Sequence, residues 1–539
     1  MDLDAIWRLH AEYYFDELRK AASLYLGDGD CSSEGLNLFQ SNYNQFQQAQ
    51  KWASANMKDD QMAAFLCLAY SHAGQDLFEW RQNSLERAKW LEDALAAALL
   101  LRDSSSLSLI LNSLGTAYVK LGRTSEAIAV YQQSLRLDKE LSDRSGEAVV
   151  LGNLGAAYAE SGDVRRAIPF YLDQLKLAVE LDDAASEAKA LNNLGAAHST
   201  LGKGREALAY YEQTLAVLEK LADKRAQSRT LVNIGLEYAN LHLWGRAIQY
   251  YTDASEIDRK LGDDQSVGVT SLNLGIAYRH IPETARAIDC FNESLQIAQK
   301  YSNGQLEANA LGNLGIVYKE SGDLEAAKGL FQRQLEIEQK LGNEIGEAKA
   351  LANLATLFDE SEVAQAIANY EKALAIHERL GHRSVEAQLL ANLGAAYAYS
   401  GEEERGFQCL ERALGIARQI GDAGAEAAAL SNSGFVNAWL TNWDRAVECF
   451  GQALVINRRL QDKVSEINNL GSLAIALENL SQFEGALKCY QRRVQIAREI
   501  NDPVSERQEL LRVSSVLKQM GDDEGAQRCL LEAEGIPGG

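Results

Sequence analysis

An asparagine recurs at one position of a repeated phrase, and its carboxamide can both accept and donate hydrogen bonds. The phrases LGNLGAAY at 151–158 and LGNLGIVY at 311–318 carry it directly before their second leucine. The residues at this position are Asn153, Asn193, Asn233, Asn273, Asn313, Asn353, Asn392 and Asn432. Asparagine is unfavourable inside a helix, so its repeated presence needs a reason beyond duplication of the repeats.

Two explanations of this asparagine row are open. The side chains could bind the main chain of a partner segment, each accepting from an N–H and donating to a carbonyl. Alternatively, each asparagine bonds a neighbouring helix and only stabilises the stack. The first explanation predicts a peptide-binding site formed by the whole row.

Other positions of the same phrase support a binding groove. Four residues before the asparagine lie Lys189, Arg229 and Lys349, which could bind a carboxylate or could be solvated surface charges. The residue directly before the asparagine is mostly small, which predicts an open channel; these residues include Gly152, Asn192, Gly312, Ala352 and Ala391. Phe435 and Trp439 predict a second, more apolar pocket.

The phrase belongs to a repeat of forty residues. Glycines mark the period, at Gly115, Gly155, Gly195, Gly235, Gly275 and Gly315. A fixed period of this length indicates stacked helical units. The first helix of each unit carries the phrase, and the second carries residues such as Ala167, Tyr171 and Leu175 on one stripe. We expect Gly and Ala to permit close helix contact and the aromatic residues to fill the space between neighbouring units.

The chain divides into three regions by this pattern. Residues 1–60 are expected to form a helical N-terminal cap, with a loop at 27–35. Residues 61–107 resemble a degenerate helix pair, and 108–539 contain about eleven units, the last of them atypical. Around 355–366 one unit is a residue short and Ala355 replaces the glycine, which predicts a tighter turn without a glycine cap.

Composition excludes several classes of function. The net charge of −23 lacks the clustered positive charge of a nucleic-acid interface and weakly favours a basic partner. No apolar run is long enough to insert in a membrane, and the start MDLDAIWRLH lacks the features of a secretory signal, so we expect a cytoplasmic protein. Five cysteines share one repeat position and are expected to be half-buried thiols; they are Cys290, Cys409, Cys449, Cys489 and Cys529.

No motif predicts catalysis, a metal or another cofactor. The segment LGKGREA at 201–207 lacks phosphate-loop spacing and is a repeat turn. His377 and His382 lack the spacing of a metal-binding pair and are expected to be solvated at a helix end, whereas His198 is expected in the core. We therefore do not expect an enzyme.

The pattern of Gly or Ala, Tyr three residues later, Gly in the turn, then Ala and Tyr resembles the tetratricopeptide repeat (TPR) family. The LGNLG phrases and the 40-residue period are similar to Pins/LGN-type adaptors and to kinesin light chains. The resemblance implies an all-α, right-handed superhelix, that is, an α-solenoid. It also implies a scaffold that binds a partner's peptide in its concave groove, where an asparagine at this position bonds peptide main chain.

The first hundred residues suggest an alternative. WRLHAEYYFDEL at 7–18 and NQFQQAQKWA at 44–53 resemble the helical segment that joins the ATPase core of bacterial STAND-type regulators to their TPR sensor. The resemblance implies a sensor or regulatory module of a signalling NTPase or effector system.

Overall fold

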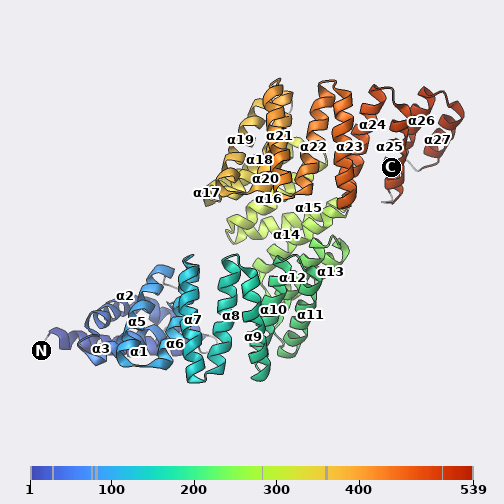
Figure 1. Cartoon of the computed structure of the whole chain (residues 1–539). Coiled ribbons are helices and arrows are strands. Elements are labelled where there is room, and N and C mark those ends of the chain that lie inside the picture. Colours follow the sequence, from blue (N-terminus) through green and yellow to red (C-terminus); the bar gives the residue numbers. More distant parts are fainter. Residues whose placement is uncertain are drawn as a thin grey trace. The chain divides into compact units, whose positions relative to one another are not determined.

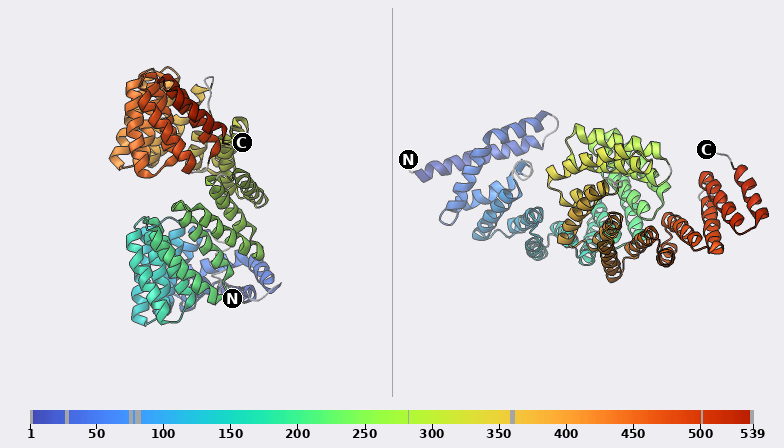
Figure 2. Two further views of the ribbon diagram at one scale, coloured as in Figure 1. Left: turned by 90° about the vertical axis from the view of Figure 1, so that its right-hand side faces the viewer. Right: turned by 90° about the horizontal axis from the view of Figure 1, so that it is seen from above.

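The computed structural model describes residues 3–26, 30–73, 77–78, 83–281, 283–357, 362–499 and 502–536, and these residues contain helices and no strand. The chain falls into two compact units, Met1–Ile281 and Pro282–Gly539 (Figures 1 and 2). The prediction of an all-α solenoid is confirmed.

Four long helices come before the regular repeats: α1 (Leu3–Tyr25), α2 (Asp30–Asn56), α3 (Gln61–Ala73) and α5 (Ser84–Leu101). The Tyr70 hydroxyl donates to the Ala11 carbonyl at 2.7 Å and so ties α3 to α1. The expectation of a loop at 27–35 is wrong over 30–35, which belong to α2. Gly35 acts there as a contact residue, because a Cβ would lie 2.6 Å from the Ala21 carbonyl oxygen of α1.

From residue 104 onward, helices that carry the repeated phrase (A helices) alternate with the second helices of each repeat (B helices) in eleven pairs. The A helices are α6 (Ser104–Lys120), α8 (Arg144–Glu160), α10 (Ala184–Thr200), α12 (Lys224–Asn240), α14 (Asp264–His280), α16 (Gly304–Glu320), α18 (Glu344–Ala355), α20 (Arg383–Tyr399), α22 (Ala423–Trp439), α24 (Lys463–Asn479) and α26 (Pro503–Gln519). The B helices are α7 (Thr124–Leu141), α9 (Val164–Glu180), α11 (Gly204–Leu221), α13 (Trp244–Leu261), α15 (Thr284–Lys300), α17 (Leu324–Leu341), α19 (Val363–Leu380), α21 (Glu403–Ile420), α23 (Trp443–Leu460), α25 (Phe483–Glu499) and α27 (Asp523–Glu534).

Glycine and an aromatic ring fit together inside six of the repeats. A Cβ on Gly115 would lie 2.5 Å from a ring carbon of Tyr131, and one on Gly315 would lie 2.5 Å from Phe331. The same contact occurs at Gly155, Gly195, Gly235 and Gly434. The A and B helices of one repeat can therefore approach closely only because the A helix has no side chain there. The aromatic column thus packs first within its own repeat, where the sequence predicts it between neighbouring repeats.

Turn residues set where the helices begin and end. Gly162 and Gly322 follow A helices with φ of 85° and 86°, the left-handed backbone that ends a helix without steric cost in glycine. An aspartate directly before an A helix caps its first turn: before α8, the Asp143 side chain accepts from the Gly146 N–H at 2.9 Å. Such a cap stabilises a helix by about 1 kcal/mol. The tighter turn predicted beyond Ala355 falls mainly on 358–361, outside the described residues.

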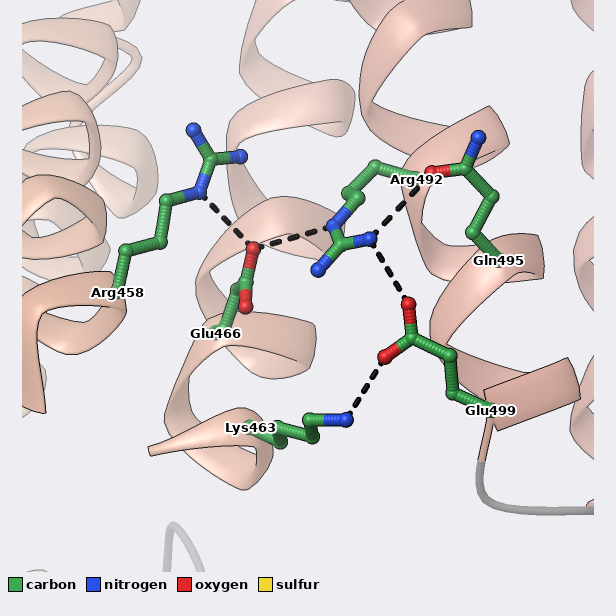
Figure 3. A network of polar contacts seen from close by, with 6 residues as sticks. All are labelled: Arg458, Lys463, Glu466, Arg492, Gln495 and Glu499. Atoms are coloured by element: carbon green, nitrogen blue, oxygen red, sulfur yellow. Dashed lines mark hydrogen bonds and ion pairs between the residues drawn. The ribbon is translucent and has the colours of Figure 1, made fainter. Parts of the chain in front are cut away.

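Ion pairs join successive repeats. A glutamate in the first turn of an A helix bonds a basic residue eight positions earlier on the preceding B helix, as Arg458 Nε does with Glu466 Oε1 at 2.9 Å. Arg492 of α25 reaches the same carboxylate at 3.4 Å and also bonds Glu499 at 3.3 Å (Figure 3). Glu466 is 5 % exposed, so its two arginines compensate for its burial.

One layer of each unit consists of A helices. In the N-terminal unit α6 contacts α8, α8 contacts α10 and α10 contacts α12; in the C-terminal unit α20 contacts α22 and α22 contacts α24. The predicted site residues all lie on A helices, from α8 to α22.

Candidate functional site

The asparagine row lies half-buried on the A helices, from Asn153 on α8 to Asn432 on α22. Three members donate across a repeat boundary: Asn153 Nδ2 to Asn112 Oδ1 at 2.8 Å, Asn233 to Asn192 at 3.2 Å, and Asn432 to Asn392 at 3.1 Å. These bonds match the structural explanation for the row. Each uses one of the two N–H groups of a carboxamide, so a second N–H remains on each donor.

The other members of the row differ. Asn313 donates to the carbonyl of Asn309 on its own helix at 2.9 Å. Asn353 Nδ2 is buried without a hydrogen-bond partner, although its side chain as a whole is only half-buried. Asn193 and Asn273 occupy the corresponding half-buried positions on α10 and α14. The side chains of the row thus share a position but differ in their hydrogen-bond partners.

The predicted basic residues are exposed. Lys189 lies on α10 and Arg229 on the next A helix, α12, within the N-terminal unit; Lys349 lies on α18 in the C-terminal unit. Burial raises the pKa of the Asp258 carboxyl, and the positive charge of Arg229 opposes this shift by a smaller amount. The structure therefore brings two of the three basic residues onto neighbouring helices of one unit.

The open channel predicted beside the row is filled at two glycines. A Cβ on Gly152 would lie 2.5 Å from Nε2 of Gln174, and one on Gly312 would lie 2.8 Å from Nε2 of Gln334. Both glutamines come from the B helix of the same repeat and are 1 % exposed. The expectation is wrong at these positions because a long polar side chain occupies the space that glycine leaves.

A third glycine of this kind admits an arginine. Gly471 of α24 faces Arg493 of α25, whose Nη1 would lie 2.6 Å from a Cβ at residue 471. Arg493 Nη2 pairs with Glu509 Oε1 of α26 at 3.1 Å. Arg493 Nε and Glu509 Oε2 are buried without hydrogen-bond partners, and burial raises the pKa of Glu509.

Next to this arginine lies a cavity of about 500 Å³ in the C-terminal unit. Carboxamides from three successive A helices line it, including two members of the predicted row, Asn392 and Asn432. Phe435 and Ile475 supply apolar surface and are 48 % and 46 % exposed. The remaining polar lining includes Asn457, Asn468, Asn469, Arg493 and Arg512. The predicted apolar pocket therefore shares Phe435 with a site that is largely polar.

Trp439 lies outside the lining of that cavity. Its ring stacks on Tyr399 with centroids 4.5 Å apart, and the two side chains are 52 % and 47 % exposed. Asn457 was not among the residues predicted from the sequence; it is 2 % exposed, and its Nδ2 has no hydrogen-bond partner. A signal existed: the same B-helix position holds Ala417 and Ala497 in the adjacent repeats.

The structure also corrects one histidine. His377 is 5 % exposed rather than solvated, and its Nδ1 lies 3.1 Å from Nδ1 of His382. Burial, and then the neighbouring His382, lower the pKa of His377. His198 is half-buried against Tyr210, with ring centroids 5.2 Å apart.

The described part of the chain contains no group of three or more His, Cys, Asp or Glu side chains placed to bind a metal ion. None of its helices has the length and apolarity needed to cross a membrane. Among the cysteines of the shared position, Cys409, Cys449 and Cys529 are half-buried thiols as predicted, and Cys489 is buried.

Comparison with known proteins supports the fold. Tetratricopeptide repeat models match residues 110–145, 146–220, 226–300, 306–378 and 425–499. No curated protein matches the chain. Neither family match includes residues 7–53, so the resemblance to STAND-type regulators stays a prediction.

Several solved structures match the chain at low identity. A Rap protein complexed with competence and sporulation factor is 16 % identical, covering 66 % of this chain and 99 % of that one, with a TM-score of 0.47. The apo quorum sensor NprR from B. thuringiensis is 16 % identical over 65 % and 99 %, with a TM-score of 0.46. Yeast Tom70 is 14 % identical over 81 % and 93 %, with a TM-score of 0.41. Because the family models cover more than half of its residues, the chain belongs to the tetratricopeptide repeat family.

Proposed function

We propose that the chain is a protein-interaction scaffold that binds a peptide segment of a partner against its A helices. The observation that carries the proposal is the cavity of the C-terminal unit, where Asn392 and Asn432 of the row lie beside exposed Phe435. Carboxamides can bind peptide main chain in either direction, and the apolar surface can take a side chain.

The cross-repeat bonds of the row fit this role as well as a structural one. The bond from Asn432 to Asn392 fixes the orientation of both carboxamides before a partner arrives. A preoriented group loses less conformational freedom on binding, which raises affinity. We extend the same role to Asn153, Asn193, Asn233, Asn273, Asn313 and Asn353, with Lys189, Arg229 and Lys349 available at the exposed surface for acidic side chains of the partner.

Selection of partners from a phage library of random 12-residue peptides would test the proposal. We expect the full chain to enrich peptides that share a motif. The double variant Asn392→Ala/Asn432→Ala should bind them about tenfold more weakly, because it removes two charge-neutral hydrogen-bonding groups together. Removing both partners of the Asn392–Asn432 bond leaves neither of these carboxamides orphaned.

The matched control is Asn292→Ala, since Asn292 is exposed on α15 and absent from the lining of the cavity. Circular dichroism should show all variants folded. Unchanged affinity in a folded double variant, or equal weakening by the control, would contradict the proposed function.

A further inference from the structure

One position on the B helices is polar in some repeats and apolar in the others. It holds Asp138, Asp258, Glu338, His377 and Asn457, and each of these residues is at most 5 % exposed. Other repeats have alanine or leucine there, such as Ala178 and Leu218. A side chain that can be apolar without loss of the fold needs another reason to be charged.

Asp138 on α7 is incompletely hydrogen-bonded. The Ser108 hydroxyl donates to its Oδ1, and the Ser134 hydroxyl in turn donates to the Ser108 carbonyl at 2.9 Å. Asp138 is only 3 % exposed, and its Oδ2 is buried and accepts no hydrogen bond. Leaving a buried carboxylate oxygen without a donor is costly, so this atom is suited to receive one from a ligand.

A cavity of about 570 Å³ in the N-terminal unit has Asp138 in its wall. It lies among α3, α6, α7 and the first turns of α8. His72 contributes a second acceptor: its Nδ1 donates to the Leu68 carbonyl at 3.2 Å, which leaves Nε2 as a bare lone pair, buried and without a partner. Burial lowers the pKa of His72, which keeps the ring neutral and Nε2 an acceptor.

Apolar residues in another part of the lining suit an aliphatic chain. Leu109, Leu141 and Val149 border the cavity and are 48 %, 46 % and 43 % exposed. Asp143 adds a second carboxylate, and none of the described residues that line the cavity is a lysine or arginine. A ligand with a positive, multiply donating head and an apolar stem matches both parts of this lining.

We propose that this cavity binds a lysine side chain of a partner polypeptide. The ammonium group donates to Asp138 Oδ2, and the methylene stem packs on Leu109, Leu141 and Val149. Asn112, which accepts from Asn153 of the row, also borders the cavity, so the lysine would belong to a segment that follows the A helices. The inference rests on the proposed function, but it concerns the N-terminal unit and different residues.

The test uses the full chain and three probes: acetyl-Gly-Ala-Lys-Ala-Gly-amide, the same peptide with norleucine for lysine, and n-butylammonium. Titrations followed by ligand-observed NMR give each affinity. We expect the lysine peptide to bind at least about tenfold more tightly than the norleucine peptide, because a charge-assisted bond is lost in the latter. Butylammonium should bind more weakly than the lysine peptide because it lacks the peptide main chain.

Asp138→Asn should abolish the preference for lysine, since it keeps the shape and removes the charge. The matched control is Asp258→Asn: Asp258 has the same repeat position, is 2 % exposed, also has an unpaired Oδ2, and is absent from this lining. Leu109→Asn provides a variant at an exposed wall residue and should weaken the lysine peptide several-fold.

Three results would overturn the inference: no preference for lysine in the wild type, equal loss in the Asp138 and Asp258 variants, or butylammonium binding as tightly as the peptide. The cavity in the C-terminal unit is unchanged in these experiments. Failure here would therefore leave the Asn392/Asn432 test unaffected, and the reverse also holds.

Discussion

The carboxamide of Gln174 fills the space that a side chain at residue 152 would need, with Nε2 2.5 Å from the position of an ideal Cβ. Gln334 and Arg493 fill the corresponding space beside Gly312 and Gly471. In two other repeats the A helix has a larger residue and the B helix a smaller one: Asn192 with Thr214 and Leu272 with Ser294. In these five repeats the sizes at the two positions compensate for one another, whereas both residues are small in the pairs Ala391 with Ala413 and Ser431 with Ala453.

Gly152→Ala should destabilise the chain by about 1–3 kcal/mol, because the new methyl group forces Gln174 to move in a closely packed site. The double variant Gly152→Ala/Gln174→Ala should be more stable than Gly152→Ala alone. Urea unfolding followed by circular dichroism measures both. As a control, Gly329→Ala on α17, where a Cβ meets nothing within 4 Å, should stabilise by roughly 0.5–1 kcal/mol. Equal effects at the two glycines would refute the volume argument.

The aromatic column predicts a graded response at Phe331, which is fully buried against Gly315. Phe331→Ala should cost about 3–5 kcal/mol because it leaves a cavity. Phe331→Leu should cost less, since Leu410 occupies the same position in its own repeat and is 2 % exposed. Thermal and urea unfolding of both variants would check the order. A leucine variant as unstable as the alanine variant would show that the ring shape itself is required.

Asp258 should make stability depend on pH. Its pKa is raised, mainly by burial and further by Asp263, whereas bonding to Ser228 and the charges of Arg229 and Arg225 lower it. A carboxyl whose pKa is higher in the folded state contributes stability that is present at low pH and is lost as pH rises through the folded value. The stability of the Asp258→Asn variant relative to the wild type should therefore be highest near neutral pH.

The free energies of unfolding of this variant and the wild type, compared between about pH 7 and about pH 4, test the point. As the pH falls, the free energy of unfolding of the wild type should rise relative to that of the variant. Asp289→Asn on the exposed face of α15 is the control and should follow the wild type throughout. If the difference in free energy of unfolding between Asp258→Asn and the wild type stayed constant with pH, the charged carboxylate would already be compensated in the folded state.

Much of the fold could be predicted because its determinants repeat. Gly155 and Tyr171 lie sixteen residues apart in one repeat, and the same spacing recurs at Gly195 and Tyr211. The helix at 30–35, where a loop was expected, could not be predicted from the sequence, because Gly35 contacts α1 rather than ending a helix.

The site was harder to predict. The asparagine row is visible as a pattern, but two of its bonds run from Asn153 to Asn112 and from Asn233 to Asn192, one residue off the repeat period, whereas the bond from Asn432 to Asn392 follows it. Such a partner depends on how successive helices are offset in space. Asp138 could have been found by aligning the repeats, because alanine and leucine at the same position mark it as buried. Its unpaired oxygen required coordinates.

The matched volumes lie within single repeats: Gly152 with Gln174, and Gly155 with Tyr171. A stretch of forty residues copied as one block thus carries both halves of each fit, provided the copy begins in the break between a B helix and the next A helix. Exchanging one helix alone would separate the halves. The array can accordingly lengthen by tandem gene duplication without any compensating substitution, whereas recombination inside a repeat would disrupt its packing.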